Sequence, residues 1–332
     1  MRNRTQTGFT LTELMIAMVL GVILAGGVVN LFVVGQKSFR MDENVARMQD
    51  EGRFAINELM KEIRMAGYIG ELVHPVAIVT DPVLTTGTDC GVAGQPDWIL
   101  GFFDDVTDDI NTLTAVDNAT GATANAGFSC INAGELLPQT DVIGIKRFAG
   151  RSVPPAELVA NTVYMQSNAL EGFMYQDPIL PGAGVAGALN EWEYRPSIYY
   201  IRNFTNTAGD GIPSLCRKVL DYTAAAPGIQ TECIAAGIEN LQIEYGLDVD
   251  ESGSVDQYLP NPTLAQLQRV ISARIFVLAR TLNQDIGYTD NRTYQLSNAA
   301  AFNPNDNFHR RLYTVTIPIF NMRNRARLLI GI

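Results

Sequence analysis

The chain opens with a short basic leader followed by a long apolar run. The run extends from Leu14 to Val34 and contains a single polar side chain, Asn30, while Arg2 and Arg4 precede it. About 20 apolar residues in a helix match the hydrocarbon thickness of a bilayer, whereas the core of a cleavable secretory signal has only about 7–15. The sequence therefore predicts a membrane-spanning helix, and the two arginines favour a cytoplasmic N-terminus.

Glu13 lies at the edge of this predicted helix, where a carboxylate is costly unless it finds a partner. A cut between Gly8 and Phe9 would create an ammonium group four residues before Glu13, on the same face of the helix. The carboxylate could then pair with its own terminus or with that of a neighbouring subunit. The alternative is an interfacial side chain that reaches to the lipid headgroups.

The segment G-F-T-L-T-E-L, residues 8–14, followed by the apolar run, resembles the type III signal of type IV pilins and type II secretion pseudopilins. The resemblance implies that prepilin peptidase cuts after Gly8 and N-methylates Phe9, and that Glu13 is the acid used in assembly. One feature departs from the family pattern. Major pilins usually carry a proline inside this apolar helix, and this chain has none there.

Apolar residues continue at spacings of three and four beyond the apolar run, with charged residues between them. This pattern predicts one helix from Thr10 to Ala66, with Gly67 as its stop. The whole chain is expected to have four parts. These are a leader at 1–8, a membrane and filament-core helix at 9–35, an amphipathic helix at 36–67 and a β-rich periplasmic head at 68–332.

The head contains short apolar runs separated by Gly, Pro, Asn, Asp, Ser and Thr, a texture typical of strands and loops. Two segments, 104–133 and 177–193, are poor in apolar residues and are expected to be loops. The fold class is therefore α+β, with a long helix packed on an antiparallel sheet. The expected strands are Trp98–Phe103, Asp141–Phe148, Thr162–Gln166, Ser197–Arg202, Leu215–Leu220, Leu241–Leu247, Val270–Arg280 and Arg311–Phe320.

Two further segments resemble the PilW family of minor pilins. These are RMQDEGRFAINELMKEIRMAGYIG at 47–70 and RRLYTVTIPIFNMRNR at 310–325, so the resemblance covers both ends of the head and the middle only loosely. It implies a low-abundance subunit that primes pilus assembly and lies near the pilus tip. The implied partners are other minor pilins, the major pilin, a tip adhesin, prepilin peptidase and the inner-membrane assembly platform.

Four cysteines lie beyond the membrane segment, on the side expected to be periplasmic: Cys90, Cys130, Cys216 and Cys233. An even number in an oxidising compartment indicates disulfides. Sequence order favours pairing Cys90 with Cys130 and Cys216 with Cys233, although three pairings are open. No C-x-x-C is present and the chain has only two histidines, which argues against a zinc site.

An acidic segment of the head follows the spacing of a calcium loop over most of its length. Oxygen-bearing side chains alternate along it, at Asp248, Asp250, Ser252, Ser254 and Asp256. Gly253 stands where such loops turn sharply, but Leu259 replaces the bidentate Glu that closes them. Calcium is accordingly the one cofactor that the sequence indicates, and an acidic turn between strands is the alternative.

Several charged clusters have a simpler explanation than a site. The run Asp104, Asp105, Asp108 and Asp109 is typical of a solvated loop. The arginines near the C-terminus fit a charged rim that blocks pairing at a sheet edge; they are Arg310, Arg311, Arg323, Arg325 and Arg327. A formal net charge of −11 argues against broad nucleic-acid binding.

No catalytic motif is present: the chain lacks a P-loop, G-x-S-x-G and H-E-x-x-H. His74 and His309 have no Ser or Cys nucleophile nearby in sequence. We therefore expect a structural protein rather than an enzyme: a minor pilin in the inner membrane and then in the pilus. Two alternatives are a J-type pseudopilin of a type II secretion system and a membrane-anchored periplasmic enzyme or ligand-binding protein.

Overall fold

The computed structural model describes residues 8–72, 78–87, 90–91, 98–101, 112–121, 128–179, 183–188, 190–223 and 227–322. They fall into two compact units, Met1–Arg47 and Met48–Ile332. The predicted loop Asp104–Asp109, His74 and the arginines from Arg323 onward lie outside the described residues.

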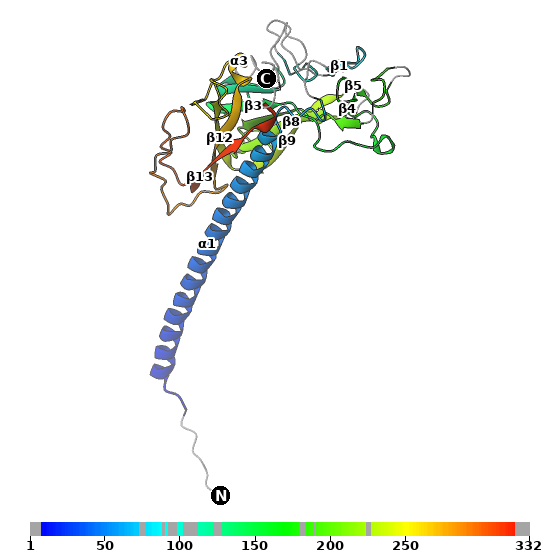
Figure 1. Cartoon of the computed structure of the whole chain (residues 1–332). Helices are drawn as coiled ribbons and strands as arrows, with labels where there is room; N and C mark the ends of the chain where they lie inside the picture. Colours follow the sequence, from blue (N-terminus) through cyan, green and yellow to red (C-terminus); the bar gives the residue numbers. More distant parts are fainter. Residues whose placement is uncertain are drawn as a thin grey trace. The chain divides into compact units, whose positions relative to one another are not determined.

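A single helix, α1 (Leu11–Arg64), supplies the first unit and continues into the second (Figure 1). Its ends agree with the predicted helix to within two residues. In the first unit every side chain from Leu11 to Arg40 is exposed. Among the described helices α1 alone has the length and hydropathy to cross a membrane, with a mean hydropathy of 2.5 over its most apolar window.

The part of α1 inside the second unit packs one face against the head. The buried residues recur every three or four positions, as expected for an amphipathic helix; they include Met48, Gly52, Ala55, Ile56, Leu59 and Ile63. Gly52 lies against the ring of Tyr313, which leaves no room for a Cβ atom. The Tyr313 hydroxyl also donates to the Gln49 carbonyl at 3.2 Å, so helix and strand meet in close contact here.

A buried ion pair fixes the same helix to the head. Arg147 Nε and Nη2 donate to the two carboxylate oxygens of Glu62 at 2.8 and 2.7 Å, and both residues are buried. Two donors on two acceptors give a bidentate geometry, which fixes orientation as well as distance. A second, more exposed pair joins Glu58 to Arg217 at 3.0 Å. Both pairs tie the last turns of α1 to strands far away in sequence.

The head contains three sheets rather than the one expected sheet. A five-stranded antiparallel sheet consists, in spatial order, of β2 (Leu113–Ala119), β3 (Thr140–Ile145), β7 (Ser197–Arg202), β8 (Ser214–Asp221) and β9 (Gly228–Ala236). A four-stranded antiparallel sheet consists of β11 (Gln257–Leu259), β10 (Ile238–Leu247), β12 (Val270–Arg280) and β13 (Arg310–Pro318). In this sheet β12 and β13 lie side by side (Figure 1).

The third sheet has four short strands and one parallel pair. It consists of β1 (Ile78–Thr80), β5 (Gly172–Gln176), β4 (Val163–Ser167) and β6 (Asn190–Glu193). β1 runs parallel to β5, and the other pairs are antiparallel. Two short helical segments, η2 (Pro155–Glu157) and α3 (Leu264–Leu267), complete the described elements. The head is thus rich in antiparallel sheets, as the α+β class requires.

Most of the predicted strands are confirmed, and three predictions are wrong. The strands at Ser197–Arg202 and Val270–Arg280 have the predicted ends. The strand predicted to begin at Trp98 is instead a turn at residues 98–100, where Trp98 packs edge-on against Phe128 at 5.2 Å between ring centroids. The segments predicted as loops contain β2 and β6, because pairing with neighbouring strands outweighs the low apolar content of these sequences.

One buried carboxylate joins the two larger sheets. Asp141 in β3 accepts hydrogen bonds from the backbone amide of Asn118 in β2 at 2.9 Å and from that of Ile243 in β10 at 2.7 Å. Burial in this setting raises the pKa of Asp141 to about 8, although the two amides act in the opposite direction. The carboxyl group therefore takes up a proton on folding at neutral pH.

We predict that replacing Glu62 with Gln will strongly destabilise the head. The substitution leaves the Arg147 guanidinium buried without a counter-charge, which costs about 3–5 kcal/mol. Denaturant unfolding of the detergent-solubilised full chain measures the loss. The matched control is Lys61→Gln on the exposed face of α1, expected to change stability by less than about 0.5 kcal/mol. The paired change Glu62→Leu with Arg147→Met should recover most of the loss, and a Glu62→Gln variant as stable as the control would contradict the assignment.

A second prediction concerns pH. Because the pKa of Asp141 is higher in the folded chain than its unfolded value of 3.8, the folded state binds the extra proton between pH 3.8 and about 8. Its contribution to stability is complete below pH 3.8 and is lost as the pH rises to about 8. Asp141→Asn, which cannot titrate, should flatten this part of the stability profile. Identical profiles for the two proteins would show that Asp141 stays ionised in the fold.

Candidate functional site

The first turn of α1 is closed by a reciprocal pair of side chains. The Thr10 amide and hydroxyl both donate to Glu13 Oε2 at 2.9 Å. The Glu13 amide in turn lies 3.3 Å from the Thr10 hydroxyl oxygen, which accepts from it. This arrangement is a capping box, which satisfies amide groups that have no partner inside the helix. This role was not among those expected for Glu13, although the T-x-x-E spacing just before an apolar run is its signature.

The capping box uses only one of the two carboxylate oxygens of Glu13. Oε2 takes both hydrogen bonds from Thr10, while Oε1 accepts none from the residues that the structure describes. The side chain is exposed, as are Gly8 and Phe9, which precede the helix in irregular backbone. The geometry thus leaves the peptide bond between Gly8 and Phe9 accessible and one carboxylate oxygen open to a further donor.

The side chains that follow Glu13 form an apolar surface that the first unit does not cover. Large apolar residues such as Leu20, Val28 and Phe32 are between 55% and 67% exposed, as expected for a helix without a packing partner. Burial of such a surface stabilises by roughly 25 cal/mol per Å² of apolar area. This helix therefore requires an apolar environment from outside its own unit, which a bilayer or other apolar helices supply.

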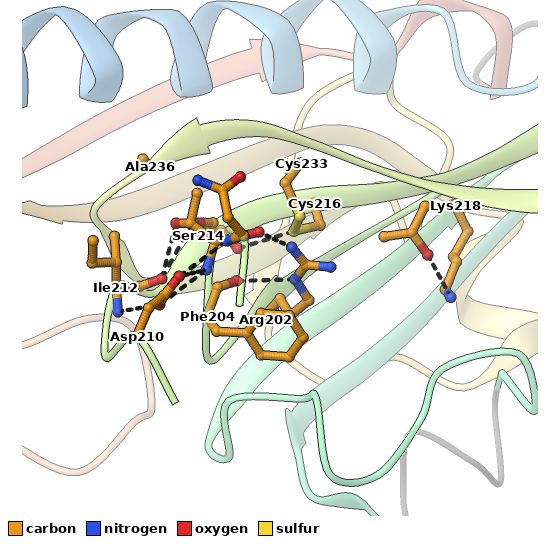
Figure 2. Close-up of a disulfide and its surroundings, with 12 residues drawn as sticks. Arg202, Phe204, Asp210, Ile212, Ser214, Cys216, Lys218, Cys233 and Ala236 are labelled. Carbon is orange, nitrogen blue, oxygen red and sulfur yellow. Dashed lines mark hydrogen bonds between the residues drawn. A yellow bond between two sulfur atoms is a disulfide. The ribbon is translucent and has the colours of Figure 1, made fainter. Parts of the chain in front are cut away.

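Within the head, one disulfide joins β8 to β9. Cys216 and Cys233 face each other in the register of the two strands and are bonded. Figure 2 shows the bond beside the loop that leads from β7 into β8. The second disulfide joins Cys90 to Cys130 in the hydrophobic core. These are the pairings that sequence order favours, and Cys90 and Cys216 are buried, which protects both bonds.

The loop from β7 to β8 is held by one carboxylate and one guanidinium. Asp210 accepts from the amides of Ile212 and Asn206 at 2.9 and 3.0 Å, and these hydrogen bonds, that of Ile212 foremost, hold its pKa below the usual range. Arg202 donates to the carbonyls of Phe204 and Thr205 and lies over the Phe204 ring at 4.1 Å (Figure 2). The loop is therefore ordered by its own side chains.

The structure brings together three of the five side chains predicted to bind calcium. One carboxylate oxygen from each of Asp248, Asp250 and Asp256 lies within 4.8 Å of the others. Ser252 and Ser254 lie in the same loop, where the Ser252 hydroxyl accepts from the Ser254 amide at 3.3 Å. The spacing seen in the sequence thus corresponds to a real convergence of oxygen atoms.

The structure corrects the prediction for one basic residue, Arg310, and shows the contacts of His309. Arg310, expected in an exposed charged rim, is buried and pairs with Glu239 and Asp306. Strand β13 does lie at the edge of its sheet, but Arg310 holds the strand in place rather than blocking pairing. His309 stacks on Tyr288 at 3.8 Å between centroids and its ring lies 3.4 Å from a carboxylate oxygen of Asp285, contacts that give it a packing role.

A polar pocket of about 320 Å³ lies between the last turns of α1 and the five-stranded sheet. Its lining includes Glu58, Glu62, Arg147, Arg217 and Glu232. These charges pair with one another, as in the contacts of Arg147 with Glu62 and of Arg217 with Glu232. The charged groups are thus directed at each other, which makes the pocket a part of the helix-to-sheet contact.

An exposed apolar helix with an acid in its first turn, continuing into a head of antiparallel sheets, defines a protein of the type IV pilin class. The prokaryotic N-terminal methylation motif matches residues 3–29, which contain Gly8, Phe9 and Glu13. The family of type IV pilus-assembly protein W matches residues 198–321, which extend from β7 to just beyond β13. Together the two matches support a PilW-family minor pilin of a type IV pilus that is processed by prepilin peptidase. No curated protein and no solved structure gives a significant match.

The two matches also bear on the alternatives left open by the N-terminus. The match to the pilus-assembly family favours a pilus subunit over a secretion pseudopilin or an anchored enzyme. Pilins are structural proteins, in agreement with the absence of a catalytic motif from the sequence. The apolar helix and the methylation motif fit anchoring in the inner membrane and later assembly into a pilus.

Proposed function

We propose that the chain is cut between Gly8 and Phe9, and that Glu13 then accepts the terminal amine of a neighbouring pilin in the assembled filament. The observation that supports this proposal is the capping box, which occupies Glu13 Oε2 with Thr10. Removal of residues 1–8 leaves Thr10 and Glu13 in the chain, so the cap survives processing. The remaining oxygen then meets an ammonium group, a pairing that an apolar surrounding strengthens.

The proposal includes an orientation for the membrane form. Arg2 and Arg4 before the apolar run favour a cytoplasmic leader. The two disulfides of the head favour an oxidising compartment, such as the periplasm. The membrane form is therefore a single-pass protein with residues 9–35 in the bilayer, an amphipathic continuation at 36–67 and a periplasmic head at 68–332, and the assembled form is exposed at the cell surface.

The proposed role is that of a subunit in a priming or tip complex. A head this large would be sterically awkward as the repeating subunit of a filament whose helices pack closely, which favours a low-copy position. The proposed partners are other minor pilins, the major pilin, a tip adhesin and the inner-membrane assembly platform. Loops such as that between β7 and β8, ordered by Asp210 and Arg202, would present a fixed surface to these partners.

The role of Glu13 is tested by Glu13→Gln in cells that carry only the variant gene. Glutamine can still serve in the capping box, so the helix start and processing should be retained. The negative charge is lost, and an unpaired ammonium within an apolar bundle costs about 3–5 kcal/mol. Recovery of the variant in sheared pili, measured by immunoblot against the membrane-bound amount, should fall by more than about tenfold.

Thr10→Ala is the matched control for this experiment. It removes the cap, at a cost of about 1 kcal/mol, and keeps the Glu13 charge. We expect it to enter pili far better than Glu13→Gln. If both variants assemble like the unmodified chain, the pairing of Glu13 with a neighbour is wrong; if both fail equally, the acid acts through the helix cap and not through a neighbour.

A further inference from the structure

Three aspartates converge in the loop that connects β10 to β11. One carboxylate oxygen from each of Asp248, Asp250 and Asp256 lies within 4.8 Å of the other two. Asp250 and Asp256 are exposed, whereas Asp248 is buried, with only 7% of its surface accessible. Carboxylates this close repel one another, so the arrangement needs a compensating positive charge or a shared proton.

Each of the three carboxylates uses one oxygen to shape the loop. Asp248 Oδ2 accepts from the Gly253 amide at 2.8 Å, Asp250 Oδ1 from the Ser252 amide at 3.0 Å and Asp256 Oδ2 from the Val249 amide at 2.6 Å. The loop thus holds its three carboxylates in place.

The second oxygen of Asp248 is the observation that points most directly to a bound cation. Asp248 Oδ1 is fully buried and has no hydrogen-bond partner among the residues that the structure describes. Buried polar atoms are nearly always paired, because an unpaired one forfeits its hydration without compensation. This atom belongs to a residue that is more than nine-tenths buried and that contributes to the acidic cluster. An ion placed among the three carboxylates would give it a partner.

The protein itself offers little positive charge to this cluster. The guanidinium of Arg269 contacts this loop, but its Nη1 donates to the Val249 carbonyl at 2.6 Å and its Nη2 lies 3.9 Å from Glu251. Within the described part of the chain, no Lys or Arg forms an ion pair with any of the three clustered aspartates. The negative charge is therefore left for an external cation.

We propose that this loop binds one calcium ion through the carboxylates of Asp248, Asp250 and Asp256. Calcium accepts six to eight oxygen ligands at about 2.3–2.6 Å in flexible geometry, and the Ser252 hydroxyl, the Ser254 carbonyl and water complete its shell. Gly253, with φ of +87°, makes the sharp turn that lets the oxygens on both sides point inward. Magnesium, which demands a near-octahedral shell at about 2.0–2.1 Å, fits such a loop less well.

The ligand set also predicts the strength of binding. Leu259 in β11 stands where a closing bidentate carboxylate would add charge and two more oxygens. With three carboxylates and no such residue, the dissociation constant belongs to the range of extracellular modules, about 10⁻⁴–10⁻³ M. A head outside the cytoplasm meets calcium at such concentrations, so the ion would order the β10–β11 loop in the exported protein. This inference does not depend on the pairing of Glu13.

The test uses the full chain in detergent, stripped of metal with a chelator. Isothermal titration with calcium chloride, and separately with magnesium chloride, measures binding, and the thermal unfolding midpoint is followed against the concentration of each ion. We expect one calcium site in the stated range, a midpoint that rises with calcium and a weaker response to magnesium. No binding heat and no midpoint shift up to about 10 mM calcium would overturn the proposal.

Asp250→Asn separates a calcium ligand from a merely structural carboxylate. Its side chain is exposed, and asparagine can still accept from the Ser252 amide, so the fold should persist. Calcium affinity should fall about tenfold or more, while the metal-free variant should be at least as stable as the unmodified chain because repulsion is relieved. Glu171→Gln, at an exposed carboxylate remote in sequence, is the charge-matched control and should keep full affinity. Equal calcium responses in both variants would also overturn the assignment.

Discussion

The first half of α1 cannot be buried by its own unit, and the rest of the protein is organised around that constraint. Every side chain from Leu11 to Arg40 is exposed, and the apolar run is long enough to cross a bilayer. If this helix leaves the bilayer, its apolar side chains need another apolar environment, because exposing them to water is unfavourable. Packing among pilin helices would provide such a surrounding, and in the proposed filament Glu13 gives the packed helices a polar contact that sets their register.

The second half of the same helix, in contrast, is covered by the head and held in a fixed position against it. The buried pair of Glu62 with Arg147 and the close fit of Gly52 against Tyr313 both secure it. A buried ion pair contributes little net stability, but breaking it is costly, so it specifies one arrangement of helix and sheet. The exposed surface of the first half of α1 is thus available to other molecules, whereas the second half packs against the head of the same chain.

The sequence predicts the parts of this fold that carry a strong local signal. The helix and the strand Val270–Arg280 are periodic or rich in β-branched residues over many positions, and both were predicted with nearly correct ends. Strands such as β6, with the sequence NEWE, carry no such signal and form through pairing with distant strands. The Glu62–Arg147 pair joins residues 85 positions apart, which no local pattern reveals. The T-x-x-E spacing could have predicted the Thr10 cap. The sequence does predict the acidic loop, but only the structure shows the unpaired oxygen of Asp248.

The mass of the N-terminal peptide tests the central claim most directly. The peptide is to be measured from membranes of cells with and without an active prepilin peptidase. A processed pilin predicts a peptide that begins with N-methylated Phe9 and appears only when the peptidase is active. A terminus that remains at Met1 in the presence of the peptidase, or a cut after the apolar run, would contradict the account, because neither would leave a new ammonium group one turn before Glu13.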